Sequence, residues 1–317
     1  MEFPLSVVFH GGEPLLVGSD RFESMCRILR AALPKDCSLY LQTNGVLLSE
    51  KIIATCSLYD VGISISIDGP TDTNDQNRGD LRGRGSHSRV LDGIRRLVGS
   101  SHGRTLFTGV LAVIDPTSDP IRTYEFLKST GAPSIDFLYR DGNHDVLPFG
   151  KASPNSLEFG KWMSDLLDYY LVDEMPTPVR VLDDMIKLQI GGTSRKEGIG
   201  TSEYGILVIE TDGTLTKNDT LKSASRLADK FDQASALATE NLQDFLSSKE
   251  FLEYHLSQKP VSPTCQACSY LTICGGGMPT HRFSNEHGLS NPSIFCADQK
   301  HLIDRIKWHL SRRKLAA

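Results

Sequence analysis

The first two-thirds of the chain alternate between short apolar stretches and amphipathic stretches of helical period, and this alternation limits the possible folds most. Strands are expected at residues 6–9, 38–42, 62–67, 105–113 and 135–139. Helices are expected between them at residues 20–33, 49–59, 87–98 and 120–129. Short connections between elements of these two kinds favour a parallel sheet or a barrel. The sequence therefore predicts an α/β fold.

Polar residues and glycines stand where several of these strands are expected to end. The strings are His10-Gly11-Gly12-Glu13-Pro14, Gln42-Thr43-Asn44-Gly45, Ser66-Ile67-Asp68-Gly69 and Leu138-Tyr139-Arg140-Asp141. Turn chemistry alone explains a single Gly, Asn or Asp. Active sites of such folds collect where strands end and helices begin, so four such strings on one rim favour a ligand site. The glycine- and arginine-rich segment from residue 68 to 85 is expected to be a mobile loop suited to an anion.

Four of the seven cysteines lie in one stretch, with the spacing Cys265-x2-Cys268-x5-Cys274-x21-Cys296. A two-residue gap lets two thiolates hold one metal centre from a single turn, and two further thiolates complete four-fold sulfur coordination. The spacing by itself fits a structural zinc ion as well as an iron–sulfur cluster. Disulfides are less favoured, because the first residues show no secretory signal and reduced thiols are then expected.

The composition of the 317 residues is that of an ordinary globular protein, with 39% hydrophobic and 23% charged residues and a net charge of −5. It shows no basic face of the kind that binds nucleic acid. No segment approaches the roughly 20 apolar residues that span a bilayer. We therefore expect a cytoplasmic protein without a nucleic-acid or membrane partner. A glycine-rich break at residues 191–200 places an expected domain boundary near residue 195.

Taken together, these strings resemble radical S-adenosylmethionine (AdoMet) enzymes that carry a SPASM domain. Residues 10–14 look like their GGEP motif, and residues 66–69 with Arg78 look like later segments of their partial barrel. The cysteine stretch resembles the auxiliary-cluster half of a SPASM domain. Closer still, four strings resemble the maturases that install cyclophane crosslinks on ribosomal peptides: Glu210-Thr211-Asp212-Gly213, Gly275-Gly276-Gly277, His281-Arg282 and Asn291-Pro292-Ser293.

This resemblance extends from Val7 to Asp304 and implies a two-domain α/β fold. Residues 1–195 would form a partial (β/α)6 TIM-like barrel that is truncated at its N-terminus. Residues 196–317 would form the cysteine-rich SPASM domain.

The chain departs from the family in its cysteines. Radical SAM enzymes carry a CxxxCxxC motif upstream of GGEP, and these 317 residues contain no such string. The expectation is therefore a truncated chain, inactive alone, that would hold the AdoMet-cleaving cluster only if an N-terminal segment with that motif were restored. Asn218 and Met278 stand where ligands of a second auxiliary cluster would be, so one auxiliary cluster is expected.

The resemblance also implies roles for particular residues. Glu13 would neutralise the methionyl ammonium of AdoMet, Ser66 would bond to its ribose, and Arg78 would pair with its carboxylate. Asp219 resembles in placement the catalytic base of related enzymes. The expected AdoMet-binding residues are His10, Gly11, Gly12, Glu13, Ser66, Asp68 and Arg78, and the expected ligands of one auxiliary 4Fe-4S cluster are Cys265, Cys268, Cys274 and Cys296.

The function that the resemblance implies is an oxidoreductase-type peptide maturase. It would form C–C crosslinks on a ribosomally synthesised precursor peptide and would receive electrons from a donor such as flavodoxin or ferredoxin. Two alternatives stay open at this point. The chain would otherwise be a catalytically dead, cluster- or zinc-bearing scaffold that binds a peptide, or a structural α/β protein stapled by a metal.

Overall fold

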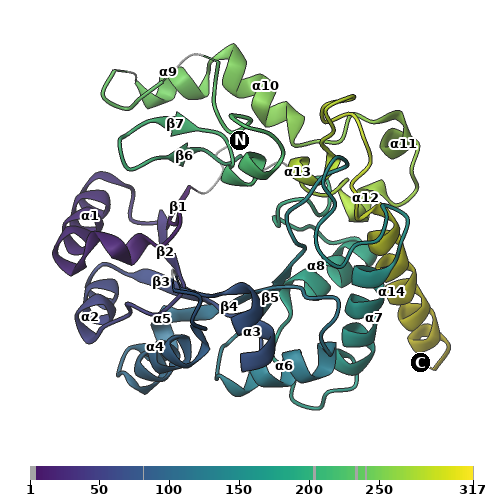
Figure 1. The fold of residues 1–317 in the computed structure, drawn as a ribbon, viewed down its shortest axis with the longest axis horizontal. Coiled ribbons are helices and arrows are strands. Elements are labelled where there is room, and N and C mark those ends of the chain that lie inside the picture. The colour runs from purple at the N-terminus through teal and green to yellow at the C-terminus, as the bar shows by residue number, and fades with distance from the viewer. Residues whose placement is uncertain (1–4, 81, 203–204, 233–234, 240, 317) are drawn as a thin grey trace. The chain divides into compact units, whose positions relative to one another are not determined.

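A computed structural model describes residues 5–80, 82–202, 205–232, 235–239 and 241–316 (Figure 1). The chain forms two compact units. The first unit comprises Met1–Leu138 and Tyr169–Arg180, and the second comprises Tyr139–Asp168 and Val181–Ala317. The expected boundary near residue 195 thus lies inside the second unit. Residues 139–168 belong with the C-terminal part because Gly160 N and Lys151 both donate to Asp298, far along the chain.

The first unit is built on a five-stranded parallel sheet with the strand order β1-β2-β3-β4-β5. Spatial order therefore follows chain order, and the predicted α/β class is confirmed. In β3, alternate apolar residues are fully buried while their neighbours are half-buried, which is the two-residue period of a strand. The strands are β1 (Ser6–Phe9), β2 (Ser38–Thr43), β3 (Val61–Ser66), β4 (Phe107–Val113) and β5 (Ile135–Leu138).

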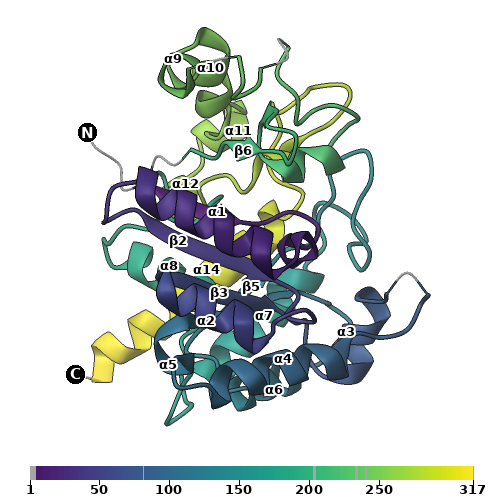
Figure 2. The ribbon, with the colours of Figure 1, turned by 90° about the vertical axis from the view of Figure 1, so that its left-hand side faces the viewer.

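Helices cross between the strands, and α1, α2 and α4 lie side by side along one face of the sheet (Figures 1 and 2). Ser49 caps α2, because its hydroxyl accepts from Ile52 N at 3.3 Å. The elements are η1 (Pro14–Val17), α1 (Ser19–Ala32), α2 (Glu50–Leu58), α3 (Thr71–Asn77), α4 (His87–Gly99), α5 (Gly103–Leu106) and α6 (Pro120–Ser129).

Helix α3 corrects one prediction, because it occupies Thr71–Asn77 inside the segment expected to be a loop. Its sequence, TDTNDQN, carries no apolar stripe that periodicity could detect. The helix is instead held by polar contacts. The Pro70 carbonyl accepts from Thr73 N at 3.0 Å and from Asn74 N at 2.8 Å, and Asn74 Oδ1 accepts from Asp68 N at 3.2 Å.

The second unit is built mainly from short helices and turns. It contains a short hairpin, with β6 (Val208–Ile209) antiparallel to β7 (Leu215–Thr216). Phe231, Phe245, Phe251 and Tyr254 form an aromatic core beside it. The helices are α7 (Glu158–Tyr170, which crosses into the first unit), α8 (Arg180–Gln189), η2 (Asp219–Ser223), α9 (Leu242–Leu246), α10 (Lys249–Ser257), α11 (Pro263–Gln266), α12 (Leu271–Cys274), α13 (Pro279–Arg282) and α14 (Cys296–Ala316).

Buried charges replace a regular sheet as the framework of this unit. Lys151 Nζ lies 2.5 Å from Asp298 Oδ2, and both side chains are fully buried. Arg282, also fully buried, donates to the carbonyls of Ser257, Gln258 and Lys259 and so satisfies the C-terminal end of α10. Within the described ranges, every helix is too short or too polar to cross a bilayer.

Candidate functional site

Glu13 joins the carboxyl ends of the first two strands. Its Oε1 accepts from Leu15 N at 3.0 Å and from Thr43 Oγ1 at 2.7 Å, and its Oε2 accepts from Asn44 N at 2.8 Å. The GGEP string therefore places a carboxylate on the rim that β1 and β2 share. Three hydrogen bonds hold the side chain in this position.

The backbone just before Glu13 is open to a ligand. His10, Gly11 and Gly12 are exposed. Apart from each glycine and its two chain neighbours, no heavy atom of the described chain lies within 4 Å of the position that a Cβ would take on either glycine. Gly11 has φ +111°, which glycine adopts without strain. A charged group could approach these peptide groups closely.

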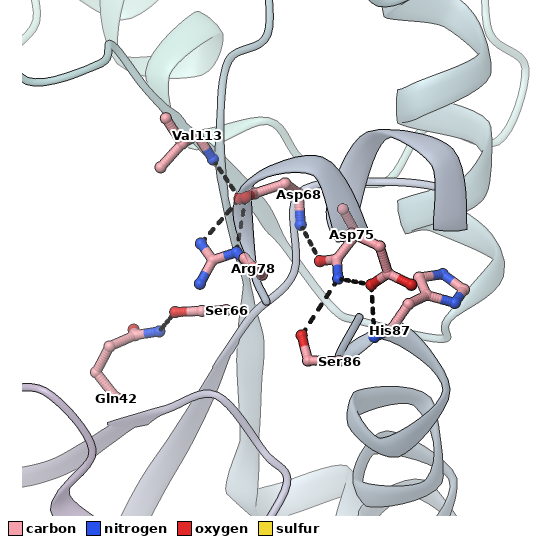
Figure 3. Close-up of polar contacts among 9 residues, drawn as sticks. Gln42, Ser66, Asp68, Asp75, Arg78, Ser86, His87 and Val113 are labelled. Carbon is pink, nitrogen blue, oxygen red and sulfur yellow. Dashed lines mark hydrogen bonds and ion pairs between the residues drawn. The ribbon is translucent and has the colours of Figure 1, made fainter. Parts of the chain in front are cut away.

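Asp68 organises the next two strand ends (Figure 3). Its carboxylate accepts from Arg78 Nε at 2.7 Å and from Arg78 Nη2 at 2.8 Å, and Oδ1 also accepts from Val113 N at 2.9 Å. This contact ties the end of β3 to the end of β4 and to the residue after α3. The Arg78 side chain stays 26% exposed, so the guanidinium is oriented yet reachable from solvent.

Ser66 links the ends of β2 and β3, because its Oγ accepts from Gln42 Nε2 at 2.8 Å (Figure 3). The structure thus brings Glu13, Ser66, Asp68 and Arg78 to the carboxyl ends of adjacent parallel strands. Sequence reasoning placed Glu13, Ser66 and Asp68 on one rim and Arg78 in the loop that follows. It did not foresee that Asp68 pairs with Arg78, or that Gln42 holds Ser66.

A polar cluster beyond this rim was also missed (Figure 3). Asp75 Oδ1 accepts from Asn74 Nδ2 at 3.0 Å and from His87 N at 2.9 Å, and so joins α3 to the start of α4. A Cβ on Gly85 would lie 2.0 Å from Asp75 Oδ2, so only glycine fits there. Burial lowers the pKa of His87 below its ordinary value. In the sequence, Gly85 just before α4 was the one signal that could have predicted this close contact.

The four clustered cysteines fall in one neighbourhood of the second unit. Cys265 and Cys274 are buried, and Cys268 and Cys296 are half-buried. Burial raises the pKa of Cys265, Cys274 and Cys296, and nearby cysteines raise each one further. Cys274 Sγ donates to Gln299 Oε1 at 3.0 Å. Among the described residues, however, no three His, Cys, Asp or Glu side chains stand close enough to hold a metal ion.

The donor set nevertheless suits a thiolate-bound centre. Four cysteine thiolates can serve as the complete ligand set of an iron–sulfur cluster or a zinc ion, and metal binding would displace the thiol protons. Gly275, Gly276 and Gly277 all have positive φ, at +69°, +86° and +72°. A Cβ on Gly275 would lie 2.4 Å from Gly200 O, so the cysteine loop packs tightly on the turn that contains Gly200.

Asp219 is the first residue of η2 and is half-buried. The residue before it, Asn218, is 4% exposed and is held on several sides. Asn218 Nδ2 donates to Glu197 Oε1 at 2.5 Å, and Asn218 N donates to the Tyr254 hydroxyl at 3.0 Å. Asp219 therefore directly follows a residue held in a polar network that sequence reasoning did not detect.

The carboxyl groups of this network influence each other. Burial is the main cause that raises the pKa of Glu197 to about 7. The charges of Asp219 and Asp141 act in the same direction, and the charge of Lys196 and the hydrogen bond from Asn218 oppose them. Burial also raises the pKa of Asp141, with Asp219 as the second cause. Two acidic groups of this unit therefore hold protons more tightly than free carboxyls do.

Comparison with curated proteins shows extended similarity at low identity. The chain is 24% identical over 315 residues to a cysteine-type anaerobic sulfatase-maturating enzyme of Clostridium perfringens, which covers 94% of this chain and 80% of that protein. It is 26% identical over 288 residues to a serine-type anaerobic sulfatase-maturating enzyme of Klebsiella aerogenes. This match covers 87% of this chain and 67% of that protein. No protein-family model matches the chain.

Solved structures show the same fold. A structure described as native anSMEcpe with bound AdoMet has a TM-score of 0.81 at 20% identity, over 97% of this chain and 83% of that one. The same protein with AdoMet and the Kp18Cys peptide has a TM-score of 0.78 at 21% identity, over 98% and 86%. Streptococcus suis SuiB bound to its precursor peptide SuiA has a TM-score of 0.56 at 13% identity, over 87% and 61%. The cyclophane subfamily, the N-terminal truncation and the SPASM details stay predictions.

Proposed function

We propose that this chain is an AdoMet-dependent radical enzyme that modifies a peptide and, more specifically, forms a C–C crosslink on a ribosomally made precursor peptide. The observation that carries the proposal is the polar rim on the parallel sheet. Glu13, Ser66, Asp68 and Arg78 lie at adjacent strand ends, in a fold shared with a protein solved with bound AdoMet. Relatives solved with bound peptides support a peptide partner.

The rim residues match the charges of AdoMet. The open peptide groups of Gly11 and Gly12 would let the methionyl ammonium approach Glu13. Arg78, already oriented by Asp68, would meet the methionyl carboxylate. Ser66, held by Gln42, would bond to the ribose.

Cys265, Cys268, Cys274 and Cys296 would hold one auxiliary 4Fe-4S cluster. When bound, AdoMet and its reducing cluster supply a 5′-deoxyadenosyl radical, and the auxiliary cluster supplies a one-electron acceptor. The three-cysteine motif that binds the reducing cluster is not among these 317 residues, so its ligands would have to come from outside this sequence.

The role of this chain's own residues follows from the atoms that a crosslink removes. Joining a side-chain carbon to an aromatic ring removes two hydrogens from the peptide. One leaves as a hydrogen atom and becomes part of 5′-deoxyadenosine. The other leaves as a proton, together with one electron that an acceptor takes up. We assign to Asp219 the role of the base that accepts this proton.

A second candidate is the modification of one serine or cysteine side chain in a protein substrate. It is favoured by the relatives, which are named as serine-type and cysteine-type sulfatase-maturating enzymes. Fragment masses of the product separate the two candidates. A crosslink suppresses cleavage between two joined residues, whereas the second candidate changes the mass of one serine or cysteine.

The first experiment tests the cysteine site. After anaerobic reconstitution of the 317-residue chain, we expect about four iron and four sulfide per chain and a brown colour. Serine at any of Cys265, Cys268, Cys274 or Cys296 should remove most of the iron. Cys37→Ser, a buried cysteine of the first unit, is the matched control and should retain it. A colourless protein with one zinc would favour the scaffold alternatives.

The second experiment tests the reaction, in a form of the protein that carries CxxxCxxC upstream of residue 1. Arg78→Met should weaken AdoMet binding by about tenfold or more, as expected for a lost charge-assisted contact. Arg95→Met, at an exposed arginine of α4, is the control. Asp219→Asn should lower crosslinked peptide per 5′-deoxyadenosine by roughly 10²–10⁴-fold, the usual loss for a positioned base. Undiminished product from that variant would remove Asp219 from the mechanism.

A further inference from the structure

The polar network around Asn218 includes Glu197, a residue of the turn after α8 that has no role in the proposed reaction. We infer that Glu197 is a positioning residue for Asp219: its carboxyl oxygen holds the Asn218 side chain, and Asn218 fixes the start of η2, where Asp219 lies. This inference rests on the proposed role of Asp219 and adds the residue through which the base is placed.

The turn that carries Glu197 is fixed at both ends. Ser194 Oγ donates to Asp184 Oδ2 at 2.9 Å on the upstream side and accepts from Lys196 N at 3.0 Å. Downstream, Gly200 N donates to Ile273 O at 2.9 Å, next to the third clustered cysteine. The Glu197 side chain therefore starts from a defined backbone position.

Gly198 packs this turn against Met278, one of the two residues that stand where ligands of a second auxiliary cluster would be. It has φ +70°, and a Cβ there would lie 2.8 Å from Met278 N and 3.1 Å from Met278 Cγ. Glu197, Asn218 and Met278 thus belong to one locality of the second unit. Where the resemblance expected ligands of another cluster, this chain has a hydrogen-bonded carboxyl–amide pair beside a thioether.

Asn218 transmits the position of Glu197 to η2. Its Nδ2 donates to Glu197 Oε1, and its Oδ1 accepts from the Thr220 N–H and from the Thr220 hydroxyl, each at 3.1 Å. The Tyr254 hydroxyl accepts from its backbone N–H. These contacts use both the nitrogen and the oxygen of the Asn218 amide, so its orientation is specified. Asp219 lies in the chain between Asn218 and Thr220, which these contacts join. A buried amide held in this way has little freedom to turn.

The charges around Glu197 support a role through its neutral form. The titratable groups that act on it are Asp219, Asp141, Lys196 and Tyr254. Its raised pKa of about 7 keeps the proton on Glu197 in slightly acidic solution. A neutral Glu197 accepts from Asn218 without placing a second negative charge beside Asp219.

The decisive experiment compares two changes at residue 197. Glu197→Gln keeps the acceptor oxygen, and Glu197→Leu removes it at similar volume. Hydrogen exchange at the Thr220 amide of the 317-residue chain reports the cap that Asn218 forms. We expect Glu197→Leu to speed this exchange by about tenfold or more, and Glu197→Gln to stay within about twofold of wild type. Glu286→Leu, at an exposed glutamate of the same unit, is the control.

The product assay adds the functional readout, in the form that carries CxxxCxxC. Crosslinked peptide per 5′-deoxyadenosine should fall at least about tenfold for Glu197→Leu and be rescued by Glu197→Gln. If Glu197→Leu does not fold, Asn218→Ser serves instead, since serine still caps η2 but cannot bridge to Glu197. It should lower the same ratio.

The outcomes separate this inference from the proposed function. Wild-type exchange and product in Glu197→Leu would overturn the positioning role, as would a Gln variant as impaired as the Leu variant. Undiminished product in Asp219→Asn would instead overturn the proposed base, whatever the exchange at Thr220 shows.

Discussion

The two compact units place their polar residues by different means. In the first unit, parallel strands deliver Glu13, Ser66 and Asp68 to one edge of a sheet, and hydrogen bonds between neighbouring strand ends then orient them. In the second unit, the framework is a buried ion pair, a buried arginine and turns that meet from distant parts of the chain. A backbone ladder tolerates the loss of one side chain better than a framework made of side chains does.

The largest effect on stability is expected from the buried pair of Lys151 and Asp298. Lys151→Met leaves the Asp298 carboxylate fully buried without its partner, which typically costs about 3–5 kcal/mol of unfolding free energy. Urea unfolding monitored by circular dichroism measures this loss. The double variant Lys151→Met with Asp298→Leu should recover part of it, because no uncompensated charge remains. A loss below about 1 kcal/mol would show that the pair does not support the second unit.

A smaller effect, dependent on pH, is expected from Glu197. Its pKa is raised from 4.5 to about 7 in the folded chain, so the folded state binds more protons than the unfolded state in this range. The stability due to its protonated form is complete below about pH 4.5 and is lost as the pH rises through 7. Glu197→Gln mimics the neutral acid, so near pH 8 it should be more stable than wild type by about 1–3 kcal/mol.

Measuring unfolding free energies at several pH values from 5 to 8 tests this expectation. The difference between Glu197→Gln and wild type should grow from pH 5 to about pH 7 and level off above it. Glu286→Gln, at an exposed glutamate, should follow wild type throughout. A constant difference would mean that Glu197 ionises at its ordinary pKa.

The same contrast between the units explains what the sequence could predict. Strands β1 to β5 and helices α1, α2, α4 and α6 were predicted within two residues at every end, because apolar periodicity encodes them locally. Helix α3 was missed because its contacts are polar. At the rim, the residues were predicted but their partners were not: Asp68 with Arg78 and Gln42 with Ser66 pair across separate elements. Glu197 gave no sequence signal, since its significance depends on a turn meeting Asn218.

A moderate effect is expected in the first unit when Glu13 is changed. Glu13→Ala removes three hydrogen bonds and leaves Asn44 N and the buried Thr43 hydroxyl without this acceptor. A cost of about 1–2 kcal/mol is expected, because solvent at this half-buried site can replace part of what is lost. Thermal unfolding measures it, with Glu23→Ala on α1 as the control. A cost as large as that of Lys151→Met would weaken the contrast between the two units.

The smallest effect is expected from an ion pair that resembles the Lys151 pair in chemistry but not in burial. Arg122 donates to Asp72 at 2.6 Å and 3.0 Å, and both side chains are 58% exposed. Arg122→Met changes charge and shape much as Lys151→Met does, yet water solvates Asp72 before and after the change. Its unfolding midpoint should be nearly that of wild type, and 1 M salt should erase any difference. If Arg122→Met destabilised the chain as strongly as Lys151→Met, burial would not be what separates the two units.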